Sequence, residues 1–269
     1  MSNSDASTTR DGQNVALVHE QLRSGILRGE IPTGEISQVA LGRHLRAGRT
    51  PLREAIRMLQ HEGLVISEPN RRVRVADLSA ADAEDLSVMR ICLEGMAIRL
   101  TVPALGGRDI GELEGLMAQM EHFRRIQDDT SYAIAHRLFH TRLISEGGER
   151  LTTLASQLFD HAERYRIAFA VRTPELWDAR HAEHRVILDA VIAGQSDAAA
   201  RCLVQHYGSS AMMIFDALGG DYTPDRLRTA LASAAPGAER SLSRLSSDVG
   251  VEPGDPSQCV GSSTDEAGR

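Results

Sequence analysis

Residues 78–218 constrain the fold most, because their apolar side chains recur at steps of three and four with no convincing strand pattern between them. Glycines and prolines divide this stretch into six segments of helical length. The first segment begins at Ser79, and its apolar stripe comprises Leu86, Met89, Leu93, Met96 and Leu100. Consecutive amphipathic helices of this kind predict an antiparallel all-α helical bundle.

A different order of elements precedes the bundle. Three helices are predicted, over 14–28, from Ser37 and from Thr50, and two β-prone runs follow at 64–66 and 73–75. The residues between the two runs include proline and asparagine, which favour a turn. Three helices followed by a β-hairpin wing are the order of a winged helix-turn-helix, so the chain is predicted to be mainly α.

These patterns divide the chain into four parts. Residues 1–13 are polar without an apolar period, and they are predicted to be a disordered leader. Residues 14–76 form the winged helix-turn-helix and residues 77–220 the helical bundle. Residues 221–269 are rich in Ser, Gly, Pro and Asp, and they are predicted to be a mostly disordered tail with one weak helical segment.

The charge is distributed unevenly between the two folded parts. The whole chain has a formal net charge of −7. Residues 1–76 hold 11 Arg against 8 acidic residues, whereas residues 77–269 hold 19 Arg against 29 acidic residues. A basic module joined to an acidic one is typical of a protein whose N-terminal part binds phosphate groups.

Cysteine use and hydropathy indicate the compartment. Cys92, Cys202 and Cys259 are widely spaced and form no CxxC pair, which favours a reducing environment without structural disulfides. The chain has neither a long apolar run nor a signal-peptide pattern at its start. We therefore expect a cytoplasmic protein that does not enter a membrane.

The third predicted helix begins with residues that are typical of a helix N-terminus. Thr50 is predicted as its N-cap, Pro51 as its first helical residue and Glu54 as the capping-box partner. Leu52 and Ile56 then point into the core, which leaves the opposite face for other contacts.

That opposite face has the composition of a DNA-reading element. Arg49 and Arg53 lie four positions apart on one face, and Arg57 continues it by a turn. Arginine at the start of a helix in the major groove can bond guanine O6 and N7, and Arg71 and Arg72 in the wing could reach phosphates or the minor groove. The alternative is that these arginines form an ordinary solvated face.

The stretch Ile26–Val75 resembles the winged helix-turn-helix of the GntR family of transcription regulators. The match rests on the sequence Ile31-Pro32-Thr33-Gly34, on Leu41, and on the pattern RTPLREAIRxLxxEGLV over 49–65. The resemblance covers about 50 residues, and the long pattern is highly specific.

The resemblance implies which residues contact operator DNA. It assigns that role to Arg49, Thr50 and Arg53. Gly48 departs from the usual Ser or Thr, so one cap or hydroxyl contact is missing. The wing tip at 70–72 lacks the usual Gly after Arg, which leaves the wing's DNA contact open.

Four histidines of the predicted bundle form a second candidate site. His136 and His140 are four residues apart on one predicted helix, and His184 and His206 lie on two later ones. An i, i+4 pair of imidazoles is a ready chelate, and neutral imidazole suits Zn, Ni, Cu or Fe. A histidine is more often simply packed or solvent-exposed, so the spacing alone does not establish a site.

Residues 78–218 also resemble FCD, the helical effector-binding domain found behind winged helices of the FadR-like GntR subfamily. The match rests on loose but correctly ordered motifs, which are Arg90–Glu94, Phe139-His140, Glu183–Arg185, Gly194, Asp197, Ala200 and His206. The resemblance implies a divalent metal held by an Asp and three His, with a carboxylate-bearing ligand completing the coordination.

This sequence departs from the family's pattern of one Asp and three His at one position. His140, His184 and His206 match the three His, whereas His136 occupies the place of the Asp. A four-His site is more positive by one charge, which favours an anionic ligand, or it is a degenerate site. Zn and Ni are the first metals expected.

Arg90 on the first bundle helix matches a family position that can face the effector. A buried guanidinium beside a metal would clamp a carboxylate. The alternative is an ion pair with Glu94 on the same helix.

Together these features predict a homodimeric DNA-binding repressor that binds a palindromic operator and responds to a small organic acid. One alternative is a family variant that binds an acyl or other apolar effector without metal. A metal-dependent enzyme is another alternative, with Glu183 as its only obvious general base. The enzyme hypothesis leaves the N-terminal module unexplained, so the protein is predicted not to be an enzyme.

Overall fold

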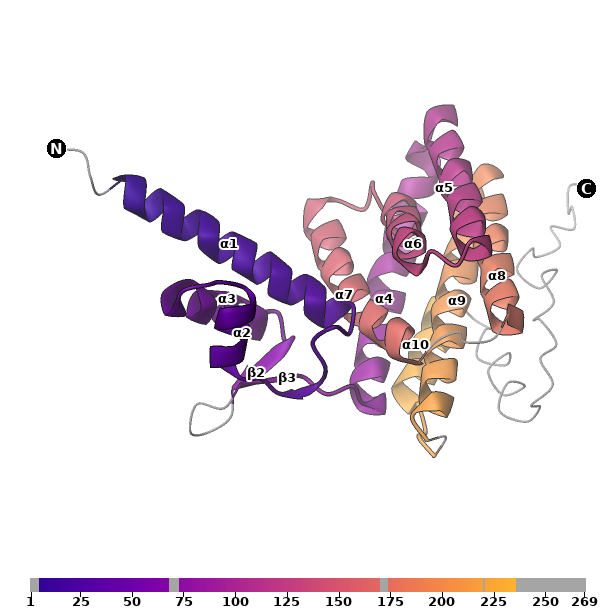
Figure 1. The fold of residues 1–269 in the computed structure, drawn as a ribbon. Helices are drawn as coiled ribbons and strands as arrows, with labels where there is room; N and C mark the ends of the chain where they lie inside the picture. The colour runs from indigo at the N-terminus through magenta and orange to yellow at the C-terminus, as the bar shows by residue number, and fades with distance from the viewer. Residues whose placement is uncertain (1–4, 68–72, 170–173, 220, 236–269) are drawn as a thin grey trace, which may run out of the picture. The chain divides into compact units, whose positions relative to one another are not determined.

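The computed structural model describes residues 5–67, 73–169, 174–219 and 221–235. Contacts between its residues divide it into two compact units. Unit 1 comprises Met1–Ser79 with Asp160–Ala168, and unit 2 comprises Ala80–Phe159 with the described part of Phe169–Arg269. Every strand of the described residues lies in unit 1, and the chain is mainly α, as predicted (Figure 1).

Unit 1 is a winged helix-turn-helix. Its elements are α1 (Asp5–Leu27), β1 (Gly34–Glu35), α2 (Gln38–His44), α3 (Arg49–His61), β2 (Val65–Ser67) and β3 (Val73–Val75). The strands form an antiparallel sheet in the order β1-β3-β2, with Val65 and Gly34 both paired to Val75. The predicted hairpin is therefore present. The two-residue strand β1 was not predicted, because so short a segment shows no period-2 pattern.

The core of unit 1 follows from the apolar periods of its helices. Val18, Leu22 and Ile26 form one stripe of α1 and are almost fully buried. They pack in one cluster with residues of α3, β2, β3 and the link between α3 and β2, namely Leu52, Ala55, Ile56, Leu59, Leu64, Val65, Val73 and Val75. Burial of each large aliphatic side chain contributes about 1.5–3 kcal/mol, so this cluster holds α3 in place.

Helix α1 begins earlier than predicted. It starts at Asp5, not at Asn14, and so includes part of the predicted leader 1–13. Extending a helix that is already nucleated and packed costs little, even where the residues are polar. Residues 1–4 of that leader and residues 236–269 of the predicted tail lie outside the described residues.

The prediction that Thr50 caps α3 is wrong. The N-cap is Gly48, which makes no side-chain cap hydrogen bond. Pro51 is tolerated within the first turn because backbone N–H groups there have no intrahelical partner. Glu54 does not complete a capping box but pairs with Arg57, whose Nη1 lies 3.2 Å from its Oε1.

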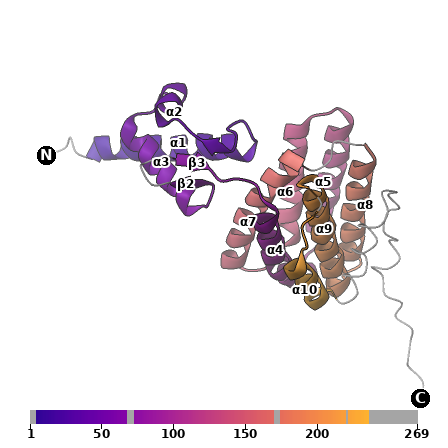
Figure 2. The same ribbon diagram turned by 90° about the horizontal axis from the view of Figure 1, so that it is seen from below.

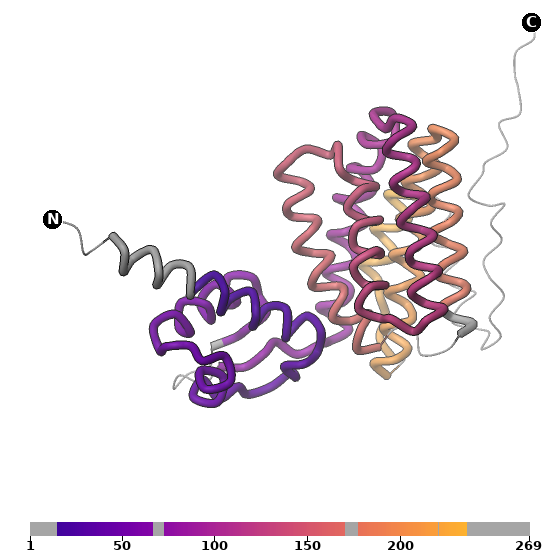
Figure 3. Tube along the Cα trace, turned by 45° about the horizontal axis from the view of Figure 1, so that its top comes forward, coloured from indigo at the N-terminus to yellow at the C-terminus, as the bar shows by residue number. Residues whose placement is uncertain are grey.

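Unit 2 is an all-helical bundle that contains each of the six predicted helices. Its elements are α4 (Ala80–Thr101), η1 (Val102–Ala104), α5 (Gly107–Arg125), α6 (Asp129–Leu143), α8 (Pro174–Ile192), α9 (Ser196–Ala217) and α10 (Asp225–Ala234). Helix α7 (Glu149–Phe169) belongs to this unit as far as Phe159, and its residues 160–168 belong to unit 1. Helix α9 packs against α4 and α8, and α5 packs against α6 and α8 (Figures 2 and 3). The described residues include no helix long and apolar enough to cross a membrane.

Helix α4 turns a different side toward the bundle than its predicted stripe implies. Of that stripe, Leu86 is buried, but Met89, Met96 and Leu100 are 41%, 52% and 50% exposed. The side packed inward carries Ile91, Ala97 and Ile98, which are fully buried, and α4 packs against α9 and α10. Because α4 is apolar on two sides, its period alone does not decide which side is buried.

Candidate metal centre

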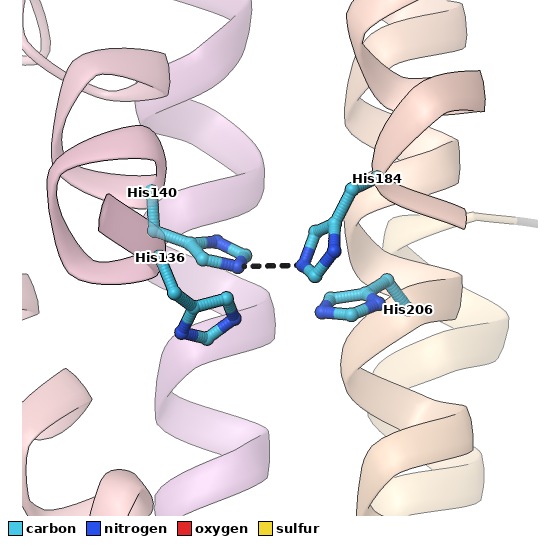
Figure 4. Close-up of side chains that lie close together, drawn as sticks. All are labelled: His136, His140, His184 and His206. Carbon is cyan, nitrogen blue, oxygen red and sulfur yellow. Dashed lines mark hydrogen bonds between the residues drawn. The ribbon is translucent and has the colours of Figure 1, made fainter. Parts of the chain in front are cut away.

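Four buried histidines from three helices of unit 2 meet at one point. His136 and His140 project from α6, His184 from α8 and His206 from α9, with their rings turned toward one another (Figure 4). One ligand nitrogen from each lies within 4.8 Å of the other three. The structure therefore brings together the four histidines that the sequence singled out.

The spacing of the nitrogens fits a metal ion. Nε2 of His140 and Nε2 of His184 are 3.2 Å apart. Tetrahedral coordination with Zn–N bonds of 2.0–2.1 Å separates two ligand nitrogens by about 3.3 Å. Phe139 and Phe159 lie against the rings, with centroids 5.5 Å from His184 and His140 respectively, and they add an apolar wall. These four residues could hold a metal.

A chain of hydrogen bonds holds Nδ1 of His140, the outer ring nitrogen, which is the one that does not face the other histidines. Tyr207 donates its hydroxyl proton to Oε2 of Glu94 at 2.5 Å, and Arg90 donates from Nε to the other oxygen of that carboxylate at 2.6 Å. The Tyr207 oxygen therefore accepts from Nδ1 of His140, 3.2 Å away. This network assigns the proton to Nδ1 and leaves the Nε2 lone pair directed at the centre.

The outer nitrogen of His206 is held in the same manner by a different carboxylate. Its Nδ1 lies 2.8 Å from Oε2 of Glu183. Arg180 donates from Nη2 to the other oxygen of Glu183 at 2.6 Å. A carboxylate partner fixes the imidazole tautomer and orientation, so Nε2 of His206 is available as a ligand.

The surroundings keep these two imidazoles neutral. Burial lowers the pKa of His140 well below its ordinary value, and the neighbouring histidines and Arg90 lower it further. Burial also lowers the pKa of His206 well below its ordinary value, with Arg180 and Arg90 adding to the effect. Neutral imidazole is the form that binds a metal.

Burial acts on Glu183 in the opposite sense. It raises the pKa of Glu183 to about 7, although Arg180 beside it and a hydrogen bond from Ser209 act to lower that pKa. This carboxyl group is therefore closely balanced between its charged and neutral forms near neutral pH.

Arg90 is largely buried, and it forms the ion pair that the sequence offered as one of two roles. Its Nε bonds Glu94, and its Cζ lies 3.9 Å from the centroid of the Tyr207 ring and 5.2 Å from that of Phe159. Burial alone would lower the pKa of Arg90, but Glu94 and Tyr207 outweigh it and raise that pKa. Its buried Nη2 makes no hydrogen bond to the described residues. The carboxylate-clamp role remains a prediction.

Sequence reasoning did not assign the residues that orient the histidines. Tyr207 directly follows His206, and Arg180 precedes His184 by one helical turn, so helix spacing would have placed Arg180 near the cluster. The bond from Glu183 to His206 joins two helices and has no such local signal.

The remaining predicted site residues lie on α3 and the wing. Arg49, Thr50, Arg53 and Arg57 are all exposed on α3. The opposite side of the same helix is buried and carries Pro51, Leu52, Ala55, Ile56 and Leu59. Arg71 and Arg72 lie outside the described residues. The DNA-contact roles of all six residues stay predictions.

The chain matches two protein families. Residues 15–75 match the bacterial regulatory proteins of the gntR family, and residues 85–209 match the FCD domain. The HTH-type transcriptional repressor GlaR of Escherichia coli K12 is 28% identical over 212 residues, which are 74% of this chain and 95% of GlaR. The probable D-xylose utilization operon transcriptional repressor of Paenarthrobacter nicotinovorans is 28% identical over 182 residues, which are 67% of this chain and 80% of that protein.

A solved structure shows the same fold. Escherichia coli McbR/YncC superposes with a TM-score of 0.65 at 20% identity, over 76% of this chain and 97% of that one. The family consists of transcriptional regulators, so the alternative of a metal-dependent enzyme is wrong. The chain belongs to the GntR family of bacterial transcriptional regulators, in the FadR-like subfamily with a C-terminal FCD domain.

Proposed function

We propose that this protein is a cytoplasmic, homodimeric repressor that a small carboxylate releases from a palindromic operator. The carboxylate binds together with a divalent transition metal in the FCD bundle. The observation that carries the proposal is the cluster of four buried histidines, two of which have their outer nitrogens held by hydrogen-bond partners. Relatives that are named as repressors support the direction of regulation.

The exposed face of α3 supports operator binding. Arg49 and Arg53 read base edges in the major groove, while Thr50 and Arg57 contact phosphates. Their exposure leaves the guanidinium groups accessible to DNA, and the buried opposite face of α3 holds the helix rigid. A homodimer then places two such helices in successive major grooves.

The bundle supports an effector site. A bound Zn or Ni ion would supply a positive centre that accepts a carboxylate oxygen. His136, His140, His184 and His206 would hold that ion, and the lowered pKa values of His140 and His206 keep those two imidazoles in the neutral form that binds a metal. Arg90 directs its unbonded Nη2 to the effector and keeps its Nε on Glu94.

Helix α7 supports a route from this site to the DNA-binding unit, because its residues belong to both units. Phe159 lies in unit 2, where its ring centroid is 5.6 Å from that of His136. The following residues belong to unit 1. Arg164 donates from Nη2 to the Ala76 carbonyl at 2.7 Å, and the Tyr165 hydroxyl bonds the backbone of Ser79. A ligand that repacks Phe159 would shift the population of arrangements of the 76–79 junction.

An exposed apolar stripe supports dimer formation. Met89, Met96 and Leu100 on α4 are among the more exposed large apolar side chains of unit 2, and Cys92 between them is also exposed. A second copy of the chain would cover this stripe in an isologous contact. Replacing Met96 by Glu is expected to shift the mass in solution from dimer to monomer, measured by light scattering.

The test measures metal content and operator binding on the same tag-free samples. We expect about one metal per chain in the wild type, little in His140→Ala and His184→Ala, and unchanged effector-free operator binding in all. His181→Ala is the matched control, since His181 lies on α8 but stacks on Trp177 at 4.9 Å, away from the cluster. Absence of metal from the wild type with operator binding intact would refute the metal site and favour an apolar effector bound without metal.

A further inference from the structure

The turn between α2 and α3 has a backbone conformation that favours glycine. The N–H of Arg46 bonds the Arg43 carbonyl at 3.3 Å, and the N–H of Ala47 bonds the Gly42 carbonyl at 2.9 Å. This pair of bonds defines a Schellman motif, in which the residue after the C-cap takes a left-handed conformation. Leu45 is the C-cap of α2, and the residue after it is Arg46, at a φ of 50°.

Other helix ends of the described residues use glycine for the same turn. Gly63 after α3 and Gly194 after α8 follow the same pair of bonds, and their φ angles are 76° and 67°. A residue with a Cβ is disfavoured there, because in a left-handed conformation the Cβ comes too close to the backbone. Arginine in place of glycine is therefore expected to lower the folding equilibrium constant about fivefold or more.

No side-chain contact within the described residues offsets this loss of stability. The Arg46 side chain is exposed, and it has neither a hydrogen bond nor an ion pair to another described residue. The side chains of Arg43 and Arg49, three positions to either side, are also exposed and have no such partner there. A residue in an unfavourable backbone conformation, with no contact in the protein that requires it, points to a role in binding.

The position of the turn indicates what Arg46 binds. In a helix-turn-helix the second helix lies in the major groove and the first crosses the phosphate backbone, so the turn between them lies near the edge of the groove. Arg46 precedes Arg49, the first residue of α3, by three positions, so their Cα atoms are at most about 11 Å apart. A guanidinium group on this turn is therefore within reach of the phosphates that border the groove.

We infer that Arg46 is a phosphate anchor, which binds the DNA backbone at the edge of the groove while α3 reads the bases. The inference rests on the proposed function, because it assumes that α3 enters the major groove. It goes further by adding a DNA contact outside α3 and the wing. It also explains why an arginine occupies a position that glycine would fill at less cost to stability.

The test separates the charge of Arg46 from its backbone conformation. Arg46→Gly removes the charge and relieves the unfavourable conformation, whereas Arg46→Gln removes the charge alone. The full chain is titrated against two duplexes of equal length, one that the wild type selects from a random pool and one of unrelated sequence. Fluorescence anisotropy at several salt concentrations measures the affinity and its salt dependence, and urea unfolding measures the stability.

Both variants are expected to bind DNA more weakly, whatever its sequence. The affinity for either duplex should fall about fivefold to tenfold in roughly 0.1 M salt, and the slope of log affinity against log salt should decrease by about 1. Arg46→Gly is also expected to unfold at a higher urea concentration than the wild type. A purely structural role for Arg46 would not give a more stable protein that binds DNA less tightly.

Gln127→Gly is the matched control for the backbone effect. Gln127 follows α5 in the same motif at a φ of 59°, it is exposed, and it is the only other non-glycine residue of the described chain with a positive φ. It belongs to unit 2, which lacks the recognition helix. Its replacement should raise the urea midpoint of unfolding and leave the affinity for both duplexes unaltered.

The outcomes distinguish this inference from the proposed function. Unchanged affinity and salt dependence in both Arg46 variants, with Arg53→Ala still weakening binding to the selected duplex, would overturn the anchor and leave base reading by α3 standing. A loss in Arg46→Gly but not in Arg46→Gln would assign the effect to the backbone and overturn the anchor. A loss confined to the selected duplex would also overturn it, because Arg46 would then read a base. If Arg53→Ala leaves the affinity unchanged as well, then the proposed role of α3 fails too.

Discussion

The recognition helix and the histidine cluster use arginine in opposite ways. Arg49 and Arg53 on α3 are exposed, and no ion pair within the described residues holds them. Arg90 and Arg180 are largely buried, and each is bonded to a glutamate. An exposed guanidinium is free to meet a phosphate or a base at little cost to the fold, and its attraction weakens as salt is added. The charge of a buried guanidinium group must be balanced by a partner in every state of the protein, so the glutamate that balances it is part of the site.

This difference indicates which side chains of each unit can be replaced without loss of stability. Side chains on the exposed face of α3 can be replaced with little effect on stability, because the core that holds the helix lies on its other side. Side chains around the histidines are bonded to one another, so the loss of one leaves another buried without its partner. The following predictions test that contrast, beginning with the largest expected effect.

Loss of one metal ligand is expected to have the largest effect. His206→Ala removes one of four imidazoles, which should weaken zinc binding on the order of 100-fold or more. Competition with a chelator of known affinity measures this loss, and His181→Ala on α8 is the control. Unchanged zinc affinity in His206→Ala would show that the cluster is not the binding site.

Loss of a base contact on the exposed face comes next. Arg53→Ala is expected to cost about 1–3 kcal/mol of operator binding, which is about 5- to 150-fold in affinity, with the free energy of unfolding unchanged. Fluorescence anisotropy and urea unfolding measure the two quantities. Arg28→Ala removes an exposed arginine of unit 1 that is paired with Glu30, so it should leave operator affinity nearly unaltered. An equal loss in both variants would indicate a general charge effect.

Loss of a hydrogen bond that orients His140 is expected to weaken zinc binding less than loss of a histidine ligand does. Tyr207→Phe removes the hydroxyl that accepts from Nδ1 of His140 and donates to Glu94. We expect about 10-fold weaker zinc binding and an unchanged effector-free operator affinity. The same chelator competition measures it. If zinc affinity remains at the wild-type value, then the hydrogen-bond chain does not position the ligand.

Glu84 provides a buried carboxylate of unit 2 outside the cluster. It accepts from the backbone N–H of Arg226 and Leu227 and from the Tyr222 hydroxyl, which ties the start of α10 to α4. Glu84→Gln is expected to lower the free energy of unfolding by about 2 kcal/mol, measured in urea, with zinc content unaltered. Asp85→Asn is the control, because Asp85 is an exposed neighbour on the same helix.

The stabilisation from Glu84 should also depend on pH. Burial would raise the pKa of Glu84, but hydrogen bonds from Leu227, Tyr222 and Arg226 outweigh it and lower that pKa. A carboxyl group whose pKa is lowered on folding stabilises the protein above its unfolded pKa, and this contribution is lost as the pH falls through the folded pKa. The difference between wild type and Glu84→Gln should therefore shrink in acid. A difference that stays constant down to pH 3 would contradict this account.

The smallest effect is expected for a phosphate contact. Arg57→Ala should weaken operator binding equally for all sequences and reduce the slope of log affinity against log salt by about 1. Arg57 already shares its charge with Glu54, which limits the loss. A change in sequence preference would mean that Arg57 reads a base.

Local patterns predicted much of this molecule. The periods of three and four placed the helices of the bundle, and the i, i+4 spacing placed His136 and His140 side by side. Three of the four histidines, His140, His184 and His206, were also named because each matches a family motif, whereas His136 was named from its spacing to His140 alone. The exposed row of Arg49, Arg53 and Arg57 on α3 followed from helix geometry in the same way.

Other features depended on contacts between distant parts of the chain. Tyr207 and Glu94 are 113 residues apart, and neither the bond between them nor that between His206 and Glu183 leaves a local signal. Helix α4 is apolar on two sides, and only its packing against α9 decided that Met96 would stay exposed. The sequence by itself determined which residues share a helix face, because that depends only on backbone geometry. The tertiary structure alone decided which buried charges meet, because that depends on how faces from separate helices pack together.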